Sequence, residues 1–135
     1  MLTEILSGLW VGDVSDLDQG SFIEDNQIGV IINCTLFDLK IKQCNVQKIP
    51  ISPDKSNNQN FQLLLRNMKQ ITRFIHSQID TKNIFILGYD KSTVPSIIVG
   101  RYMIEYGQIP ISNIKDILYS KKSDILIEID FSIFD

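Results

Sequence analysis

Cysteine and histidine are scarce in this sequence, which holds two cysteines and a single histidine. Cys34 and Cys44 are too few for a disulfide scaffold, and with one histidine they offer no pattern of zinc ligands. We therefore expect no metal and no cofactor. Because disulfide scaffolds belong to oxidising compartments, we also expect an intracellular, cytoplasmic setting.

Positive charge is also in short supply, since 13 Lys and Arg stand against 16 Asp and Glu and the formal net charge is −3. That balance gives no overall positive field to draw the chain onto nucleic acid or an anionic membrane, so neither is an expected partner. Long apolar runs are missing too, because none approaches the roughly 20 residues that cross a bilayer. Residues 1–4 lack the basic start of a signal peptide, and we expect a soluble protein.

The residues that are present suit one globular domain. With 44% hydrophobic residues, a chain of 135 residues can form one core, and we expect residues 1–135 to fold as a single unit. Short apolar runs predict strands and apolar residues at helical spacing predict helices. The expected strands are 9–11, 29–34, 46–51 and 83–88, with 29–34 central. The expected helices are 15–24, 61–79, 95–106 and 112–122.

Several details of these helices follow from particular residues. Ser15 or Asp16 can cap the first helix, and Ser112 or Asn113 the last. The helix over 61–79 is expected to be the longest, and its apolar stripe is predicted to be core rather than a groove for a partner. That stripe consists of Leu64, Leu65, Met68, Ile71, Ile75 and Ile79. Residues 52–60 are expected to form a polar loop, and the tail from 124 to 135 could be strand or helix.

Strands that alternate with helices indicate an α/β structure around a mostly parallel sheet. The strand, loop and helix over residues 84–106 resemble one particular family, the dual-specificity phosphatases. There a buried strand enters a loop of pattern His-Cys-x-x-Gly-x-x-Arg-Ser, which opens a helix. The corresponding run here is Gly88, Tyr89, Asp90, Lys91, Ser92, Thr93, Val94, Pro95 and Ser96.

The resemblance extends over residues 5–123, nearly the whole chain. Residues 9–13 resemble the family's opening Leu-Tyr-Leu-Gly strand, and residues 28–35 resemble its Ile-x-x-Val-Leu-Asn-x-Thr strand. Residues 48–51 resemble the strand that leads to the general-acid loop, and residues 114–122 the helix after the active site. The resemblance implies a central, mostly parallel sheet flanked by helices.

Cysteine-dependent phosphatases need a thiolate nucleophile, a nest of loop N–H groups, an arginine fork and an acid for the leaving group. The resemblance puts Tyr89 at the nucleophile position and Gly88 at the preceding histidine. A phenol cannot replace an activated thiolate. Pro95 stands at the arginine position, where it removes a bidentate charged contact and one backbone N–H. The resemblance therefore implies a loop that neither catalyses hydrolysis nor binds phosphate well.

Other residues of the site weaken it further or have ordinary structural roles. Ser92 replaces the loop glycine, and Asp90 brings negative charge to the place where a dianion would approach, with Lys91 as compensation. Ser96 matches the serine that assists breakdown of the intermediate, and a serine in the first turn of a helix is equally well explained structurally. Asp54 lies where the general acid would be, although a solvated turn aspartate is the favoured interpretation.

No alternative active site is evident elsewhere. Neither cysteine begins a Cys-x5-Arg pattern, and Cys34 ends a predicted buried strand, which favours a core thiol. His76 is expected on a helix surface. Asp13, Asp16 and Asp18 lack the remaining ligands of an EF-hand, so capping explains them better than calcium does.

These observations predict a pseudophosphatase that acts through a protein partner or as a subunit of a larger assembly. Two alternatives stay open. One is a weak phosphatase that uses Lys91, Ser92 or Thr93 together with Asp54. The other is a module that binds phosphopeptides without turnover, against which the missing arginine argues.

Overall fold

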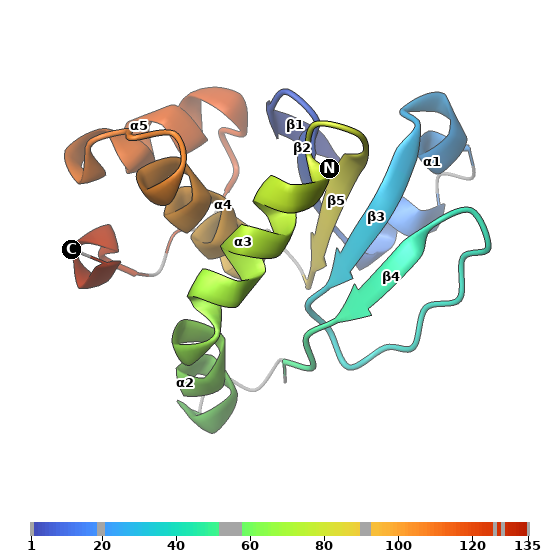
Figure 1. Cartoon of the computed structure of the whole chain (residues 1–135), viewed down its shortest axis with the longest axis horizontal. Coiled ribbons are helices and arrows are strands. Elements are labelled where there is room, and N and C mark those ends of the chain that lie inside the picture. Colours follow the sequence, from blue (N-terminus) through green and yellow to red (C-terminus); the bar gives the residue numbers. More distant parts are fainter. Residues whose placement is uncertain are drawn as a thin grey trace.

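The computed structural model describes residues 2–18, 21–51, 58–89, 93–125, 127 and 129–134. One five-stranded sheet and its flanking helices make up this part of the chain (Figure 1). The strands are β1 (Thr3–Leu6), β2 (Leu9–Asp13), β3 (Ile28–Asn33), β4 (Asn45–Lys48) and β5 (Asn83–Gly88). The helices are α1 (Phe22–Asp25), α2 (Asn58–Arg66), α3 (Met68–Gln78), α4 (Thr93–Glu105) and α5 (Ile111–Lys121), with 3-10 helices at Val14–Asp18 and Phe131–Phe134.

The sheet has the order β1-β2-β5-β3-β4 and is mostly parallel. Strand β5 pairs in parallel with β2 on one side and β3 on the other, and β3 pairs in parallel with β4. Only β1 runs antiparallel, against β2. The predicted α/β class and mostly parallel sheet are thus confirmed. The strand expected to be central, β3, is an interior strand that pairs on both sides, and β5 is the middle strand.

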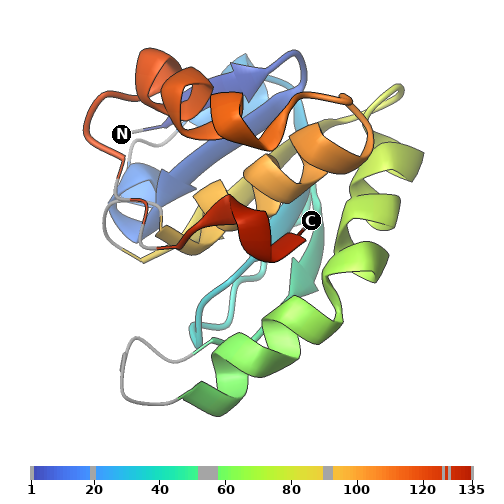
Figure 2. The ribbon, with the colours of Figure 1, turned by 90° about the vertical axis from the view of Figure 1, so that its left-hand side faces the viewer.

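The two faces of the sheet are covered differently. Helices α3, α4 and α5 and the C-terminal 3-10 helix lie over one face, where the larger hydrophobic cluster sits (Figure 2). The other face is covered by α1 and by the segment between β3 and β4, whose Leu39 and Ile41 pack against the smaller cluster that contains Phe85 and Leu87. Burial on both faces explains why β5 reads as a continuous apolar run.

The N-terminal region differs from its prediction in two ways. Strand β1 was not predicted. The single helix expected over 15–24 is wrong, because the chain forms a 3-10 helix at Val14–Asp18 and then the short helix α1. Within the described residues, no helix combines the length and the apolar character required to span a membrane.

Capping by the acidic residues after β2 is confirmed, with different partners from those expected. The backbone N–H of Ser15 donates to Asp13 Oδ1 at 3.0 Å, and the backbone N–H of Asp13 donates to Asp16 Oδ2 at 2.8 Å. This reciprocal pattern resembles a capping box, except that Asp13 accepts from the residue two rather than three positions on, and it places the cap at Asp13 rather than at Ser15 or Asp16. Gly12 permits the approach, because a Cβ there would lie 2.5 Å from Asp16 Oδ2. The side chain of Asp18 lies outside the described residues.

The helix predicted over 61–79 is two helices, α2 and α3, separated at Asn67. The side-chain amide of Asn67 donates to the carbonyl of Leu63 at 3.0 Å, a local bond of the kind that competes with continued helix. Among the described residues the longest helix is therefore α4, with 13 residues. The predicted core stripe is confirmed at Leu64, Met68 and Ile75, which are buried. Leu65, Ile71 and Ile79 are half-buried and pack against the same cluster.

Other boundaries shift by a few residues. The polar loop expected over 52–60 ends earlier, because α2 begins at Asn58; residues 52–57 lie outside the described part. Pro95 is the third residue of α4 rather than the first, still within the turn whose N–H groups have no helical partner. Caps at Ser112 or Asn113 are wrong, because Pro110 precedes α5, which begins at Ile111.

The tail, undecided from the sequence, ends in the 3-10 helix Phe131–Phe134, which docks on α4. The ring of Phe131 is 2% exposed and lies against Gly100, where a Cβ would come within 2.3 Å of it. The Arg101 guanidinium donates to the Phe134 carbonyl at 3.0 Å and lies 5.2 Å from the centre of the Phe134 ring. The tail is thus part of the main core.

Candidate functional site

The candidate site lies where parallel strands β3 and β5 end at the same edge of the sheet. The loop after β5 begins at Gly88 and Tyr89 and returns to the described structure at Thr93, the first residue of α4. Asp90, Lys91 and Ser92 lie outside the described residues, as does Asp54. Their sequence-based interpretations therefore stay predictions.

Tyr89 lies at the position that the resemblance gives to the nucleophile, and it connects its own loop to the loops that contain Leu36 and Ile51. Its hydroxyl donates to the carbonyl of Ile51 at 2.8 Å and accepts the backbone N–H of Leu36, also at 2.8 Å. Its ring meets Phe37 edge to face, with centroids 6.1 Å apart. The phenol is thus held by backbone groups and performs a structural role.

Gly88 and Pro95 pack so closely that no larger residue fits at position 88. A methyl group there would lie 2.6 Å from Cδ and 2.8 Å from Cγ of the Pro95 ring, well inside the contact distance of about 3.5 Å. Pro95 is buried. The resemblance places a histidine at the position of Gly88 and an arginine at the position of Pro95. In this chain the proline ring packs on the glycine instead.

This packing predicts that Gly88→Ala will lower the free energy of unfolding by about 2 kcal/mol, the typical cost of overpacking. In a Pro95→Ala background the ring is absent, and the same change should cost far less. Urea unfolding of the four proteins of this double-mutant cycle measures the coupling. Gly29→Ala is the control, because a Cβ there would come no closer than 3.3 Å to any neighbour, against 2.6 Å at Gly88. An equal loss with and without the proline ring would contradict the predicted packing.

Ser96 is fully buried, and its hydroxyl donates to the carbonyl of Thr93 at 2.6 Å. This bond lies inside the first turn of α4 and gives Ser96 the structural role that the sequence left open. Thr93 and Val94 are half-buried in the same turn.

The turn after β3 belongs to the site and was missed as a functional element. Asn33 is fully buried; its amide donates to the Phe37 carbonyl at 2.7 Å, and its Oδ1 accepts the Thr35 backbone N–H at 3.1 Å and hydroxyl at 2.6 Å. These bonds fix the turn that presents Leu36 to Tyr89 and leaves Leu36 and Phe37 51% and 55% exposed. The Asn-x-Thr pattern after a buried strand was the available signal.

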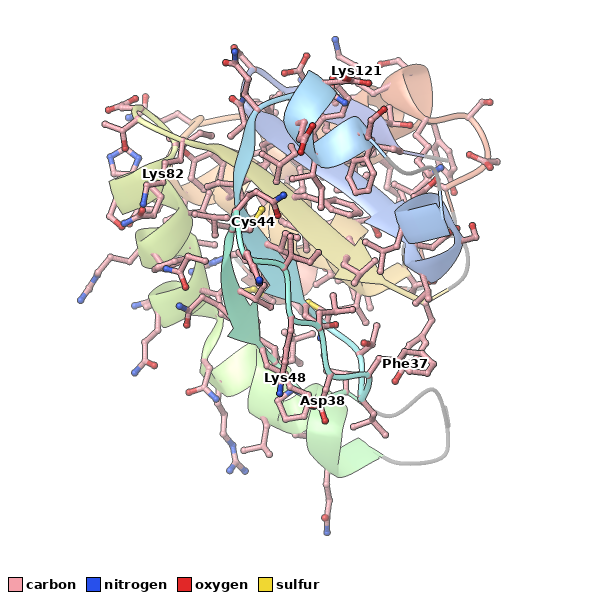
Figure 3. All side chains as sticks on the ribbon, turned by 90° about the vertical axis from the view of Figure 1, so that its right-hand side faces the viewer. Phe37, Asp38, Cys44, Lys48, Lys82 and Lys121 are labelled. Atoms are coloured by element: carbon pink, nitrogen blue, oxygen red, sulfur yellow. The ribbon has the colours of Figure 1, made fainter. Side chains whose placement is uncertain are left out.

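Lys48 and Asp38 close the rim of the site on the β4 side (Figure 3). The ammonium of Lys48 donates to Asp38 Oδ1 at 2.5 Å and to the Leu36 carbonyl at 3.2 Å. The hydrogen bond and charge of Lys48 lower the pKa of the exposed Asp38 carboxyl below its ordinary value. Lys48 therefore links the end of β4 to the turn that carries Leu36 and Phe37.

The thiols and the histidine have ordinary roles. Cys34 is 0% exposed, as predicted for a core thiol, and burial raises its pKa to about 12. Cys44 donates its S–H to the Ile28 carbonyl at 3.1 Å, and burial raises its pKa as well. His76 is exposed on α3, as predicted, and stacks on Tyr106 with centroids 4.1 Å apart. Among the described residues, no three His, Cys, Asp or Glu side chains gather where they could hold a metal ion.

No protein-family model and no curated protein matches the chain. Solved structures do share its fold. A leucine-rich-repeat and phosphatase-domain protein from Entamoeba histolytica aligns at TM-score 0.78 and 17% identity, over 98% of this chain and 85% of that one. DUSP15 aligns at 0.82 and 16%, over 98% and 83%. The human tyrosine phosphatase-like serine/threonine/tyrosine-interacting protein aligns at 0.79 and 16%, over 96% and 89%. These similarities establish the dual-specificity-phosphatase fold for this chain.

Proposed function

We propose that this chain is a catalytically inactive protein of the phosphatase fold that acts inside the cell through protein binding, as an interaction module or a structural subunit. The observation that carries the proposal is the use made of Tyr89. The Tyr89 hydroxyl is hydrogen-bonded to the backbone of Ile51 and of Leu36. The residue at the nucleophile position therefore connects neighbouring loops. A tyrosine in this role has no thiolate to offer to phosphorus.

The packing of Pro95 on Gly88 supports the same conclusion. The Pro95 ring packs on Gly88, which leaves the loop without the guanidinium fork that binds phosphate oxygens and with one N–H fewer in the nest. A loss at one position would leave a trap for phosphorylated ligands. Losses at both positions remove binding together with turnover.

A role in protein binding is supported by the rim of the site. Leu36 and Phe37 are large apolar side chains, both more than half exposed, and they lie beside Tyr89 in a rigid turn. Exposed aromatic and aliphatic side chains on a fixed support are common anchors of interfaces. One structure of the same fold is that of a phosphatase-like protein named for an interaction, so the fold is compatible with such a role.

Hydrolysis of p-nitrophenyl phosphate by the purified full chain tests the proposal. We expect no turnover above a heat-killed sample, and also none from a Tyr89→Cys variant, because the restored thiol would still lack the arginine. An active dual-specificity phosphatase in the same buffer is the positive control. Phosphotyrosine and phosphothreonine peptides should bind no better than their unphosphorylated forms. Turnover by the unaltered chain, or a clear preference for the phosphorylated peptides, would overturn the proposal.

A further inference from the structure

Charge is divided very unevenly along this chain. Residues 36–78 contain seven of the 13 Lys and Arg but only two of the 16 Asp and Glu, which gives this segment a net charge of +5 and the rest of the chain −8. The total of −3 hides the division. Since local rather than total charge attracts a ligand to a surface, the segment 36–78 can bind acidic partners.

The division in sequence is also a division in space. The segment 36–78 comprises β4, α2, α3 and their connections, and it gathers around the edge strand β4, with α3 over one face of the sheet and the connection before β4 over the other (Figure 1). In Figure 3, Lys48 lies in the lower half of the molecule, whereas Lys121, from the acidic remainder, lies at the top. Helices α2 and α3 carry no Asp or Glu, and their Arg66, Lys69 and Arg73 are all exposed.

An apolar groove of about 220 Å³ lies within this basic half, between β4 and α3. Its apolar walls come from Ile32, Ile49, Ile71 and Phe74, and its polar rim from Gln47, Lys48 and Gln70. Ile32 is buried, whereas Ile49, Ile71 and Phe74 are half-buried. Ile71 was predicted to be core, and it is also a wall of this groove.

The cations of α3 flank the groove. Gln70 and Phe74 are one helical turn apart and line it, and Lys69 and Arg73 form the adjacent row, also one turn apart. Lys48 stands on the opposite wall, at the end of β4, where it is paired with Asp38. The apolar slot therefore has exposed cations beside its α3 wall and the Lys48–Asp38 ion pair on its β4 wall.

We propose that this groove binds an acidic peptide segment of a partner protein, with one or more apolar side chains in the slot and carboxylates facing Lys69 and Arg73. This deepens and rests on the proposed function, because it names the kind of partner that an interaction module of this fold would bind. Apolar walls favour a peptide over nucleic acid. A nucleic acid would bind mainly through its phosphate charges and would place no apolar group in the slot. An anionic membrane would likewise meet the cations without filling a slot.

Selection from a random 12-residue peptide library displayed on phage, with the purified full chain as bait, tests the partner class. We expect the selected peptides to be rich in Asp and Glu around Leu, Ile or Phe. The best one, labelled with a fluorophore, is then titrated by anisotropy. Replacing its acidic residues with Asn and Gln, or its apolar residues with Ala, should each weaken binding by about tenfold or more. Basic or neutral selected peptides would overturn the proposal.

Charge reversal on the protein locates the site. The double variant Lys69→Glu, Arg73→Glu should weaken the selected peptide by about tenfold or more, because like charges then face each other. The matched control is Lys115→Glu, Lys121→Glu, an equal charge change at two exposed positions of α5. It should bind like the unaltered chain, and circular dichroism checks that both variants fold. An equal loss of peptide affinity in both variants would show that binding depends on the net charge of the protein rather than on this groove, and would overturn the proposal.

Competition separates the other classes of ligand. A 20-mer of uridylate and vesicles containing phosphatidylserine should displace the peptide only weakly, and tighter binding of either than of the peptide would overturn the proposal. The phosphatase assay is independent of these measurements. If the chain binds the peptide and also hydrolyses aryl phosphate, only the proposed inactivity is contradicted. If it hydrolyses nothing and binds none of the peptides, only this inference is contradicted.

Discussion

Truncation of Phe131 to alanine is expected to lower the free energy of unfolding by about 3 to 5 kcal/mol, the range for removing a buried aromatic ring. The ring is 2% exposed and belongs to the main hydrophobic cluster. Gly100 accommodates it, because any side chain at that position would occupy the space of the ring. The cost is large because the cavity would lie between a helix and a short 3-10 turn that owes its position to this contact.

Chemical denaturation measures this loss, and limited proteolysis shows where it acts. The released tail should be cleaved in the variant before the rest of the chain. Ile133→Ala is the control, since Ile133 lies on the same 3-10 turn and is 52% exposed; it should change stability by no more than about 0.5 kcal/mol. Similar losses in the two variants would mean that the tail contributes little to the core.

A second large effect is expected at Asn33, whose replacement by leucine should cost about 3 kcal/mol. The change leaves the N–H and hydroxyl of Thr35 and the carbonyl of Phe37 without their partner, and unsatisfied buried groups cost about 1 to 3 kcal/mol each. Part of that cost is recovered, because the Phe37 carbonyl is only partly buried and water can reach it.

Urea unfolding again measures the loss, with Asn45→Ala as the control. Asn45 is exposed on β4, and its side chain accepts a hydrogen bond from Gln47 at the surface. Hydrogen exchange at Leu36 gives a second measure, because the turn holds that N–H against Tyr89. Unchanged protection of Leu36 in the Asn33 variant would show that Tyr89, rather than Asn33, fixes the turn.

The strands were predictable where the sequence carries one consistent signal. β5 was predicted with its bounds at 83–88, because four consecutive apolar residues, Ile84 to Leu87, are covered on both faces. The break at Asn67 was not predictable from periodicity, because the apolar stripe continues with the same spacing through α2 and α3. β1 was missed because a four-residue strand that contains Glu4 gives no apolar run.

The site could be located from the sequence, but its contacts could not be. The order of motifs placed Tyr89 and Pro95 at two functional positions. The role of Tyr89, however, depends on Leu36 and Ile51, which are 53 and 38 residues away in the sequence. The groove has the same origin, because it is formed by β4 and α3 only when both pack around Ile32. Contacts between distant segments leave no periodic trace.

The place of β5 also governs the order in which the chain can assemble during its synthesis. β2 and β3 have no pairing with each other, and both pair with β5. Until residue 88 leaves the ribosome, the nascent chain can form only two separate two-stranded pieces, β1 with β2 and β3 with β4, and pieces of that size are at best marginally stable. The edges of β2 and β3 that β5 will cover are therefore exposed to other chains until the middle strand arrives, which makes the synthesis of the segment between β2 and β5 a period of aggregation risk.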